Sequence, residues 1–321
     1  MHMRFRSLSF LLLSSGLLLF APLASAQTNG ADCRNLVVNH TYAGNFTGYL
    51  NLPVYMNNPD DGTVGVVPNA GAGKITFLPG GRITNTETLM IGMLGGHKDT
   101  VITGKYTLAW DRKANPAVCV GAIHASDGST SYDFQLIVPA NADRIEMIHT
   151  NTGLIVGTSM FPMSFPACHN SSMTGTYTYN STGWAIASPT TPPDQLLAAY
   201  IPGAMSGAMH FYPSVPPDST TFSDAPAGAG SVQAWDGLSV NGAILTRTMT
   251  GWYKISRDCT LTLVLLDNIG YPPFHIEGFV GRGSDTVYAV NTDTVDPDGS
   301  GPPVFLMPIT LSHSKYVNDR D

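Results

Sequence analysis

The stretch Ser131-Tyr-Asp-Phe-Gln-Leu-Ile-Val138 decides the fold, because its apolar and polar side chains alternate. Tyr132, Phe134, Leu136 and Val138 would share one face, with Asp133 and Gln135 on the other. An alternation of period two predicts a β-strand with one buried face. The same pattern recurs in the second half of the chain, over residues 259–265. Both halves are therefore predicted to be built from strands.

Turn signals such as Pro79-Gly80-Gly81 and Asp127-Gly128 separate the alternating runs, and no long helical pattern is present. The first half has about eight candidate strands, over residues 40–50, 72–78, 82–90, 101–111, 117–125, 131–138, 143–150 and 154–161. Eight short sequential strands favour an up-and-down antiparallel barrel, which has no exposed sheet edge. The expected fold class is all-β with two tandem antiparallel barrels, and a sandwich is the alternative.

The second half repeats the first. Tyr42-Ala-Gly-Asn-Phe-Thr-Gly-Tyr49 aligns with Tyr177-Thr-Tyr-Asn-Ser-Thr-Gly-Trp184, at the same offset of 135 that separates Cys33 from Cys168. Further matches follow in the same order, which is hard to obtain by chance and indicates a duplication. They are residues 103–106 with 250–253, Cys119 with Cys259, and 143–152 with 285–294. We expect one domain over residues 27–166 and a second over residues 167–321.

The two copies differ in length. Ala70-Gly-Ala-Gly73 aligns with Ala227-Gly-Ala-Gly230 at an offset of 157, which assigns 22 extra residues to the second copy. The alignment predicts a Pro-rich insertion at residues 185–226, which contains an apolar patch from Leu196 to Tyr212. We expect a surface loop, and a lid or docking segment is the alternative.

The four cysteines are expected to form two disulfides, because exported chains with an even cysteine count usually bridge them. If both copies fold alike, equivalent pairs must be equally close, which favours Cys33–Cys119 and Cys168–Cys259. A metal site is disfavoured, because no two of the cysteines have a C-x-x-C spacing.

Residues 1–26 have the features of a cleavable signal peptide. Arg4 and Arg6 precede an apolar run over residues 8–20, and Ala24-Ser25-Ala26 supplies the small residues of a cleavage site. The apolar run is shorter than the roughly 20 residues that a membrane-spanning helix needs. We therefore expect a secreted or periplasmic protein without a membrane span.

The charge of the chain disfavours nucleic acid as a partner. Without the signal peptide, 14 basic residues stand against 23 acidic ones, and no basic run is present. Phosphate neutralisation by basic side chains supplies most of the affinity for nucleic acid.

Several motifs resemble a repeat of exported bacterial proteins of unassigned function. They are Cys33, Thr41-Tyr42, Gly73-Lys-Ile-Thr-Phe77 with Gly80-Gly81, Gly104-Lys-Tyr106 and Asp258-Cys-Thr260. The first copy departs from the pattern at Val118-Cys-Val120. The strand over residues 103–106 also resembles the first strand of lipocalin-like and avidin-like barrels, and allene oxide cyclase barrels are similar in architecture alone. Fold by itself does not fix function.

The sequence contains no nucleophile elbow, zinc-protease motif, phosphate loop or dinucleotide fingerprint. An acidic loop, Asp293 to Asp298, could offer oxygen ligands to calcium, but the other positions of a calcium loop are missing, and a solvated turn is favoured. No metal or cofactor is expected. Glu146 and His149 are the crude acid/base candidates of an enzyme hypothesis.

The remaining candidates are aromatic residues that recur between the copies or lie on neighbouring strands. They are Tyr42, Tyr49, Tyr106, Trp110, Tyr177, Trp184, Trp252 and Tyr253. Most such rings fill the core of a small barrel, but some could line a cavity for a small apolar or aromatic ligand. The first functional hypothesis is a secreted, non-catalytic binding protein for such a ligand or for a surface partner. The alternatives are a barrel-type cyclase or isomerase and a structural, surface-matrix protein.

Overall fold

The computed structural model describes residues 32–51, 66–91, 97–163, 168–186, 200–214, 224–270, 272–295 and 303–314. Residues Asp32–Asp321 belong to one compact unit. The signal peptide expected at residues 1–26 lies outside the described residues. Among the described residues, no helix is long and apolar enough to cross a membrane.

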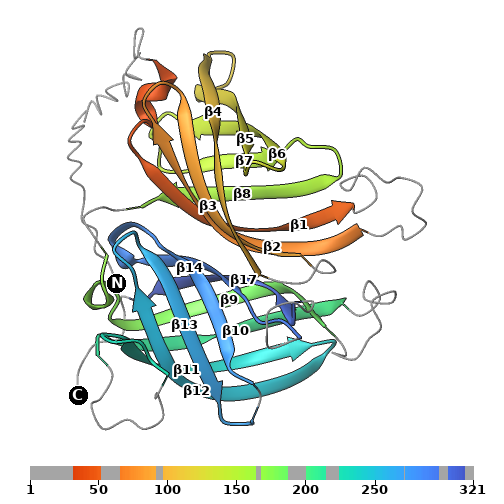
Figure 1. The fold of residues 1–321 in the computed structure, drawn as a ribbon, viewed down its shortest axis with the longest axis vertical. Coiled ribbons are helices and arrows are strands. Elements are labelled where there is room, and N and C mark those ends of the chain that lie inside the picture. The colour runs from red at the N-terminus through yellow and green to blue at the C-terminus, as the bar shows by residue number, and fades with distance from the viewer. Residues whose placement is uncertain are drawn as a thin grey trace, which may run out of the picture. The chain divides into compact units, whose positions relative to one another are not determined.

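The first barrel is closed by eight antiparallel strands in sequential order, β1 to β8 (Figure 1). Their bounds are β1 Thr41–Asn51, β2 Val66–Leu78, β3 Arg82–Ile91, β4 His97–Asp111, β5 Val118–Ser126, β6 Ser131–Pro139, β7 Ile145–His149 and β8 Leu154–Pro162. A 3₁₀ helix, Cys33–Leu36, precedes β1. Pairing of β1 with β8 closes the barrel, so the sheet has no free edge.

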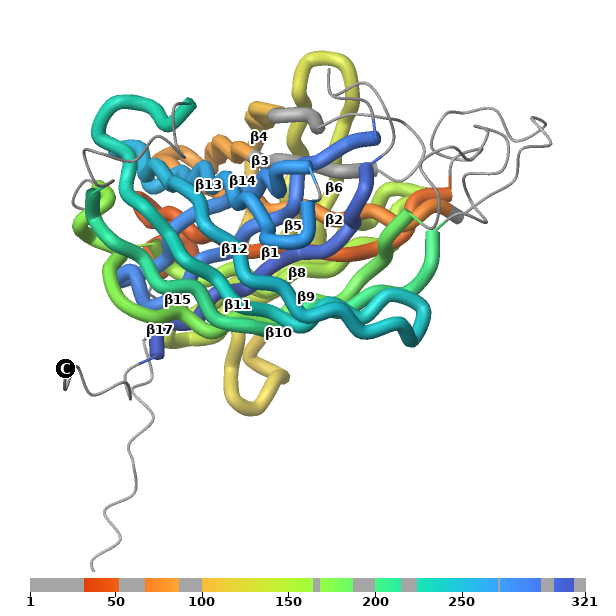
Figure 2. The backbone as a smooth tube through the Cα atoms, turned by 90° about the horizontal axis from the view of Figure 1, so that it is seen from below, coloured from red at the N-terminus to blue at the C-terminus, as the bar shows by residue number. Residues whose placement is uncertain are grey.

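The second barrel repeats this order, and Figure 2 shows β10, β11 and β12 running side by side in its wall. Its strands are β9 Gly175–Ile186, β10 Tyr200–Tyr212, β11 Gly230–Val240, β12 Ala243–Ile255, β13 Thr260–Asp267, β14 Phe274–Val280, β15 Thr286–Asn291 and β17 Pro308–His313. The short strand β16, Phe305–Leu306, precedes β17 in the chain, and both strands pair with β9. Pairing of β9 with β10 closes the ring. The all-β prediction of two antiparallel barrels is confirmed, and the sandwich alternative is wrong.

Each barrel contains one disulfide, Cys33–Cys119 in the first and Cys168–Cys259 in the second. The predicted pairing is confirmed. Each bond ties the segment before the first strand of a barrel to the start of its fifth strand. Both bonds close loops of similar length, with sequence separations of 86 and 91 residues.

A cluster of three aromatic rings fills the same end of each barrel. In both clusters a phenylalanine lies between two tyrosines, with edge-to-face contacts at centroid distances of 4.9 to 5.9 Å. This geometry is favourable for aromatic pairs. The rings are Tyr42, Phe77 and Tyr106 in the first barrel and Tyr177, Phe211 and Tyr253 in the second.

The matching clusters show which strands correspond. Phe211 on β10 takes the place of Phe77 on β2, so β10 is the counterpart of β2. The region of the expected insertion, residues 185–226, therefore contains a wall strand of the barrel, Tyr200–Tyr212, and the longer connection of the second copy is residues 213–229, between β10 and β11. Residues 187–199 and 215–223 of that region lie outside the described residues.

The two barrels share an apolar contact surface. Ala43, Ala70 and Ala72, which point outward from β1 and β2, belong to the hydrophobic cluster of the second barrel. The second barrel contributes β14, β15 and β17, which contact β1 and β2. The contact therefore joins the first two strands of one barrel to the last three of the other, and it positions the candidate site.

Candidate functional site

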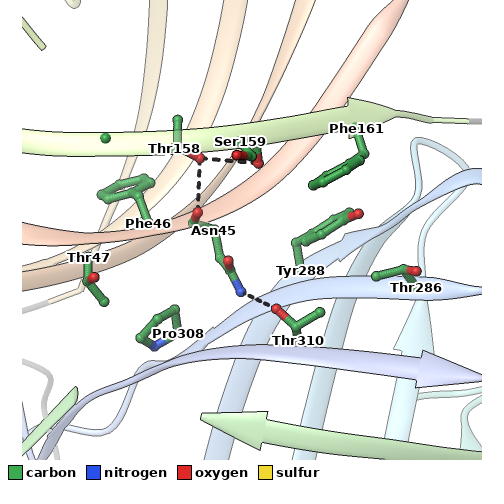
Figure 3. A pocket seen from close by; sticks show the side chains of 11 residues that line it. Asn45, Phe46, Thr47, Thr158, Ser159, Phe161, Thr286, Tyr288, Pro308 and Thr310 are labelled. Carbon is green, nitrogen blue, oxygen red and sulfur yellow. Dashed lines mark hydrogen bonds between the residues drawn. The ribbon is translucent and has the colours of Figure 1, made fainter. Parts of the chain in front are cut away.

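A cleft of about 570 Å³ lies where β1 and β8 of the first barrel meet β15 and β17 of the second (Figure 3). Its size is within the range of small-molecule sites, which is roughly 300–1,000 Å³. The lining residues are Asn45, Phe46, Thr47, Gly157, Thr158, Ser159, Phe161, Thr286, Tyr288, Pro308 and Thr310. None of these side chains is charged. Six of them are Ser, Thr or Asn: four belong to the first barrel and two, both threonines, to the second.

Two glycines of β1 let this strand run close to β8. A Cβ atom added to Gly44 would lie 2.5 Å from the carbonyl oxygen of Ser159, and one added to Gly48 would lie 2.2 Å from that of Ile155. Any larger residue would push the strands apart, so glycine is required at both positions. Asn45 and Thr47, between them, contribute to the cleft lining.

Asn45 connects the two barrels at the cleft. Its side-chain Nδ2 donates to the carbonyl oxygen of Ile309 at 3.1 Å and to Thr310 Oγ1 at 2.9 Å. The hydroxyl of Thr158 on β8 donates to the main-chain oxygen of Asn45 at 2.9 Å (Figure 3). These bonds fix the polar wall of the cleft.

Phe161 on β8 and Tyr288 on β15 lie face to face at one end of the cleft, as Figure 3 shows. Their centroids are 5.6 Å apart and their planes differ by 4°. Burial raises the pKa of Tyr288 to about 12, so its hydroxyl stays neutral at physiological pH. The pair offers a flat apolar surface beside a hydroxyl group.

A second aromatic pair, Tyr49 and Trp184, also joins the barrels. Their ring centroids are 5.2 Å apart in an edge-to-face arrangement. On β1, Tyr49 lies six residues beyond Ala43, which is the partner of Phe161 in the β1–β8 ladder. That spacing is roughly 20 Å along a strand, so the two aromatic pairs mark opposite ends of the contact between the barrels.

An ion pair joins the barrels outside the cleft. Lys74 Nζ on β2 donates to the carbonyl oxygen of Asp258 at 3.0 Å and pairs with its carboxylate, and it lies 5.3 Å from the ring centroid of Phe279. Burial alone would raise the pKa of Asp258, but its bond to Lys74 holds the pKa below the usual value. The residues that line the cleft are uncharged, whereas this ion pair stabilises the contact between the barrels outside the cleft.

The structure places the eight predicted aromatic residues in two kinds of environment. Four tyrosines lie in the barrel cores, and three of these donate their hydroxyls to backbone carbonyls. Tyr42 donates to Ala142, Tyr177 to Ser284, and Tyr253 to both Asn170 and Met173. Tyr106 is buried against Phe77.

The other four aromatic residues lie outside the barrel cores. Tyr49 and Trp184, which match in the alignment, are brought together by the contact between the barrels. Trp110 packs against the edge of the first core. Trp252 donates its indole N–H to Asp224 at 3.3 Å.

The acid/base pair of the enzyme hypothesis is not brought together. His149 packs against Phe134 inside the first barrel, whereas Glu146, an odd number of residues away on β7, bonds to the hydroxyl of Ser159 outside it. Burial lowers the pKa of His149 to about 4. Asp293, from the candidate calcium loop, bonds to His275 and Asn291, and residues 296–302 of that loop lie outside the described residues. No cluster of three metal-binding side chains occurs in the described part of the chain.

A buried charged cluster inside the second barrel was missed by the sequence reasoning. Asp236 accepts hydrogen bonds from Tyr179 at 2.7 Å and from Arg247 Nε and Nη2 at 2.9 and 2.6 Å. The sequence pattern could have revealed this cluster, because Asp236 and Arg247 both occupy inward positions in strands whose side chains alternate between inside and outside. The cleft residues Phe161 and Tyr288 were also missed, and no sequence pattern reveals that they meet.

Comparisons with known proteins assign no function to the chain. No family model matches the chain, and no curated protein matches it. One solved structure is similar, that of a protein of unknown function from the DUF3598 family of Nostoc punctiforme. The two are 9% identical over 87% of this chain and 96% of that chain, with a TM-score of 0.21.

Proposed function

We propose that this is an exported, non-catalytic binding protein that holds a small neutral molecule in the cleft between its barrels. The observation that carries the proposal is the uncharged cleft, which combines a stacked aromatic pair with several hydroxyl and amide groups. Such a lining suits a ligand that joins hydroxyl groups to an apolar or aromatic ring. The two disulfides support an oxidising compartment, outside the cytoplasm.

The chemistry of the lining argues for a neutral ligand. A charged ligand loses its hydration when it is buried, and it needs an opposite charge to compensate. The residues that line the cleft provide none, and the carboxylate of Glu146, which accepts a hydrogen bond from Ser159, is already paired with Arg144. Threonine hydroxyls can both donate and accept hydrogen bonds, which matches the hydroxyl groups of a sugar-like ring.

Native mass spectrometry of the protein from an exporting host, followed by the same sample denatured, tests for a bound molecule. The expected result is a small neutral molecule that leaves only on denaturation. Calorimetric titration with p-nitrophenyl glycosides, which combine a polyhydroxylated ring with an aromatic ring, then measures affinity. Release of nitrophenol in the same samples would support an enzyme instead.

A variant that fills the cleft gives the specific control. Thr47→Arg places a long cation in the cleft, and it should abolish glycoside binding. Thr107→Arg makes the same change at an exposed position of β4, and it should bind like the wild type. Equal binding by both variants, or no binding by the wild type to any glycoside and no co-purified molecule, would overturn the proposal.

A further inference from the structure

The contact between the barrels covers a row of apolar side chains on the second barrel. Phe279, Val290 and Leu306 lie on β14, β15 and β16, and all three are at most 2% exposed. They belong to one cluster with alanines from β1 and β2 of the first barrel. A face of small residues therefore covers a row of large ones.

The first barrel has the same row at the equivalent positions. In the second barrel, Glu277 pairs with Val290 and Phe279 with Tyr288. In the first, Gln135 pairs with Ile148 and Ile137 with Glu146, which is the same register. Ile155 is in the same way the counterpart of Leu306. Ile155 pairs with Tyr49 and Leu306 pairs with Trp184, and Tyr49 and Trp184 occupy matching positions in the two copies.

In the first barrel this row is uncovered. Ile137, Ile148 and Ile155 are 41%, 51% and 68% exposed. They lie on neighbouring strands at diagonal positions, which are close enough for side chains to form one continuous row. Exposed contiguous apolar surface of this kind marks an interaction site.

The second barrel in turn presents an uncovered copy of the small-residue face. The counterparts of Ala43, Ala70 and Ala72 are Thr178, Ala204 and Ser206, on β9 and β10. Thr178 and Ser206 are exposed, and Ala204 is half-buried. Asn45 and Thr47, which lie in the contact between the barrels, are likewise repeated as the exposed residues Asn180 and Thr182.

We propose that the chain associates head to tail with further copies of itself through these two faces. The isoleucine row on β6, β7 and β8 of one molecule would dock on β9 and β10 of the next, and so repeat the contact within the chain. The two faces differ, so the interface is heterologous, and heterologous contacts form rings or open filaments. The proposal does not depend on the ligand of the cleft.

The contact between molecules should be weaker than the contact within one. The positions equivalent to Lys74 and Asp258 hold Ala208 and Val118, so the ion pair has no counterpart. The tether between the two barrels also gives the internal contact a high effective concentration. Association should therefore be reversible and depend on protein concentration.

Sedimentation velocity of the full chain across a dilution series tests the association. The sedimentation coefficient should rise with concentration for the wild type. Ile148→Lys, on the row, and Thr182→Arg, on the small-residue face, should each remove this rise. Val101→Lys, at a 62% exposed position of β4 away from both faces, should leave it unchanged. Circular dichroism spectra that match the wild type check folding.

A mixture of the two single variants provides the sharpest test. Ile148→Lys keeps an intact small-residue face, and Thr182→Arg keeps an intact row. Together they should form a one-to-one dimer and nothing larger, although each alone stays monomeric. A wild type that remains monomeric at every concentration would overturn the proposal. So would a mixture that stays monomeric, or a Val101→Lys variant that loses association as Ile148→Lys does.

Discussion

The buried ion pair of the second barrel allows a quantitative test of the packing. Asp236 and Arg247 oppose each other on β11 and β12, and their side chains are 0% and 5% exposed. Arg247 also contacts Met205 Sδ at 3.6 Å and lies 5.6 Å from the ring centroid of Phe274. The thioether of Met205 and the ring of Phe274 therefore pack against the buried guanidinium beside Asp236.

Asp236→Asn keeps the shape of the side chain but leaves the guanidinium without its counter-charge. Burial alone would lower the pKa of Arg247, but Asp236 holds it above its usual value, so the arginine is charged in the folded protein. Removing one partner of a buried pair costs about 3–5 kcal/mol. We expect a loss of about 3 kcal/mol, because asparagine can still accept one hydrogen bond.

Hydrogen exchange followed by mass spectrometry measures this loss for each barrel separately, which a single unfolding curve of a two-barrel protein does not. Peptides from β11 and β12 should lose protection in Asp236→Asn, and peptides from β4 and β5 should keep it. The double variant Asp236→Leu with Arg247→Met, which removes both charges, should recover most of the stability. A loss below about 1 kcal/mol in Asp236→Asn, or an equal loss in both barrels, would refute the reasoning.

Three further predictions concern other parts of the barrels. The pKa of His149 falls from the ordinary 6.5 to about 4 on folding, so the unfolded chain takes up a proton first and the first barrel should lose about 2 kcal/mol between pH 7 and pH 5. His149→Asn, the residue at the equivalent position of the second copy, should remove this pH dependence in thermal unfolding. Replacing both Cys33 and Cys119 by serine should destabilise the first barrel by at most roughly 4–5 kcal/mol, measured by hydrogen exchange of its peptides, and leave the second barrel unchanged. Gly251→Ala, whose Cβ would lie 1.8 Å from the carbonyl oxygen of Val264, should destabilise by about 1–3 kcal/mol or more in the same assay. Gly237→Ala, which meets nothing within 4 Å, should be neutral.

The wall of each barrel could be predicted because strand periodicity is a local property. Alternation over residues 131–138 places Phe134 and Leu136 inside, as the structure does. The disulfides followed from the repeat, since equivalent cysteines must be equally close. Strand β10 was missed because the Ala-Gly-Ala-Gly sequence at residues 70–73 occurs again at residues 227–230, outside the equivalent strand.

The cleft could not be predicted, because it depends on how two separate barrels pack. Phe161 and Tyr288 are far apart in the sequence, and nothing local distinguishes them from other outward residues. The duplicated aromatic residues mostly have the same structural role in both barrels. Tyr42 and Tyr177, for example, donate equivalent hydrogen bonds to backbone carbonyls. Tyr49 and Trp184 are the exception, because these matching residues lie at the contact between the barrels and pack against each other.

Hydrogen exchange in the presence of the tightest-binding p-nitrophenyl glycoside shows whether the cleft between the barrels holds the ligand, because it locates the bound molecule. If the ligand lies in the cleft, peptides that cover β1, β8, β15 and β17 gain protection, and Thr47→Arg shows no change. Protection confined to peptides of β11 and β12, around the buried pair of the second barrel, would contradict this location and place the ligand inside that barrel.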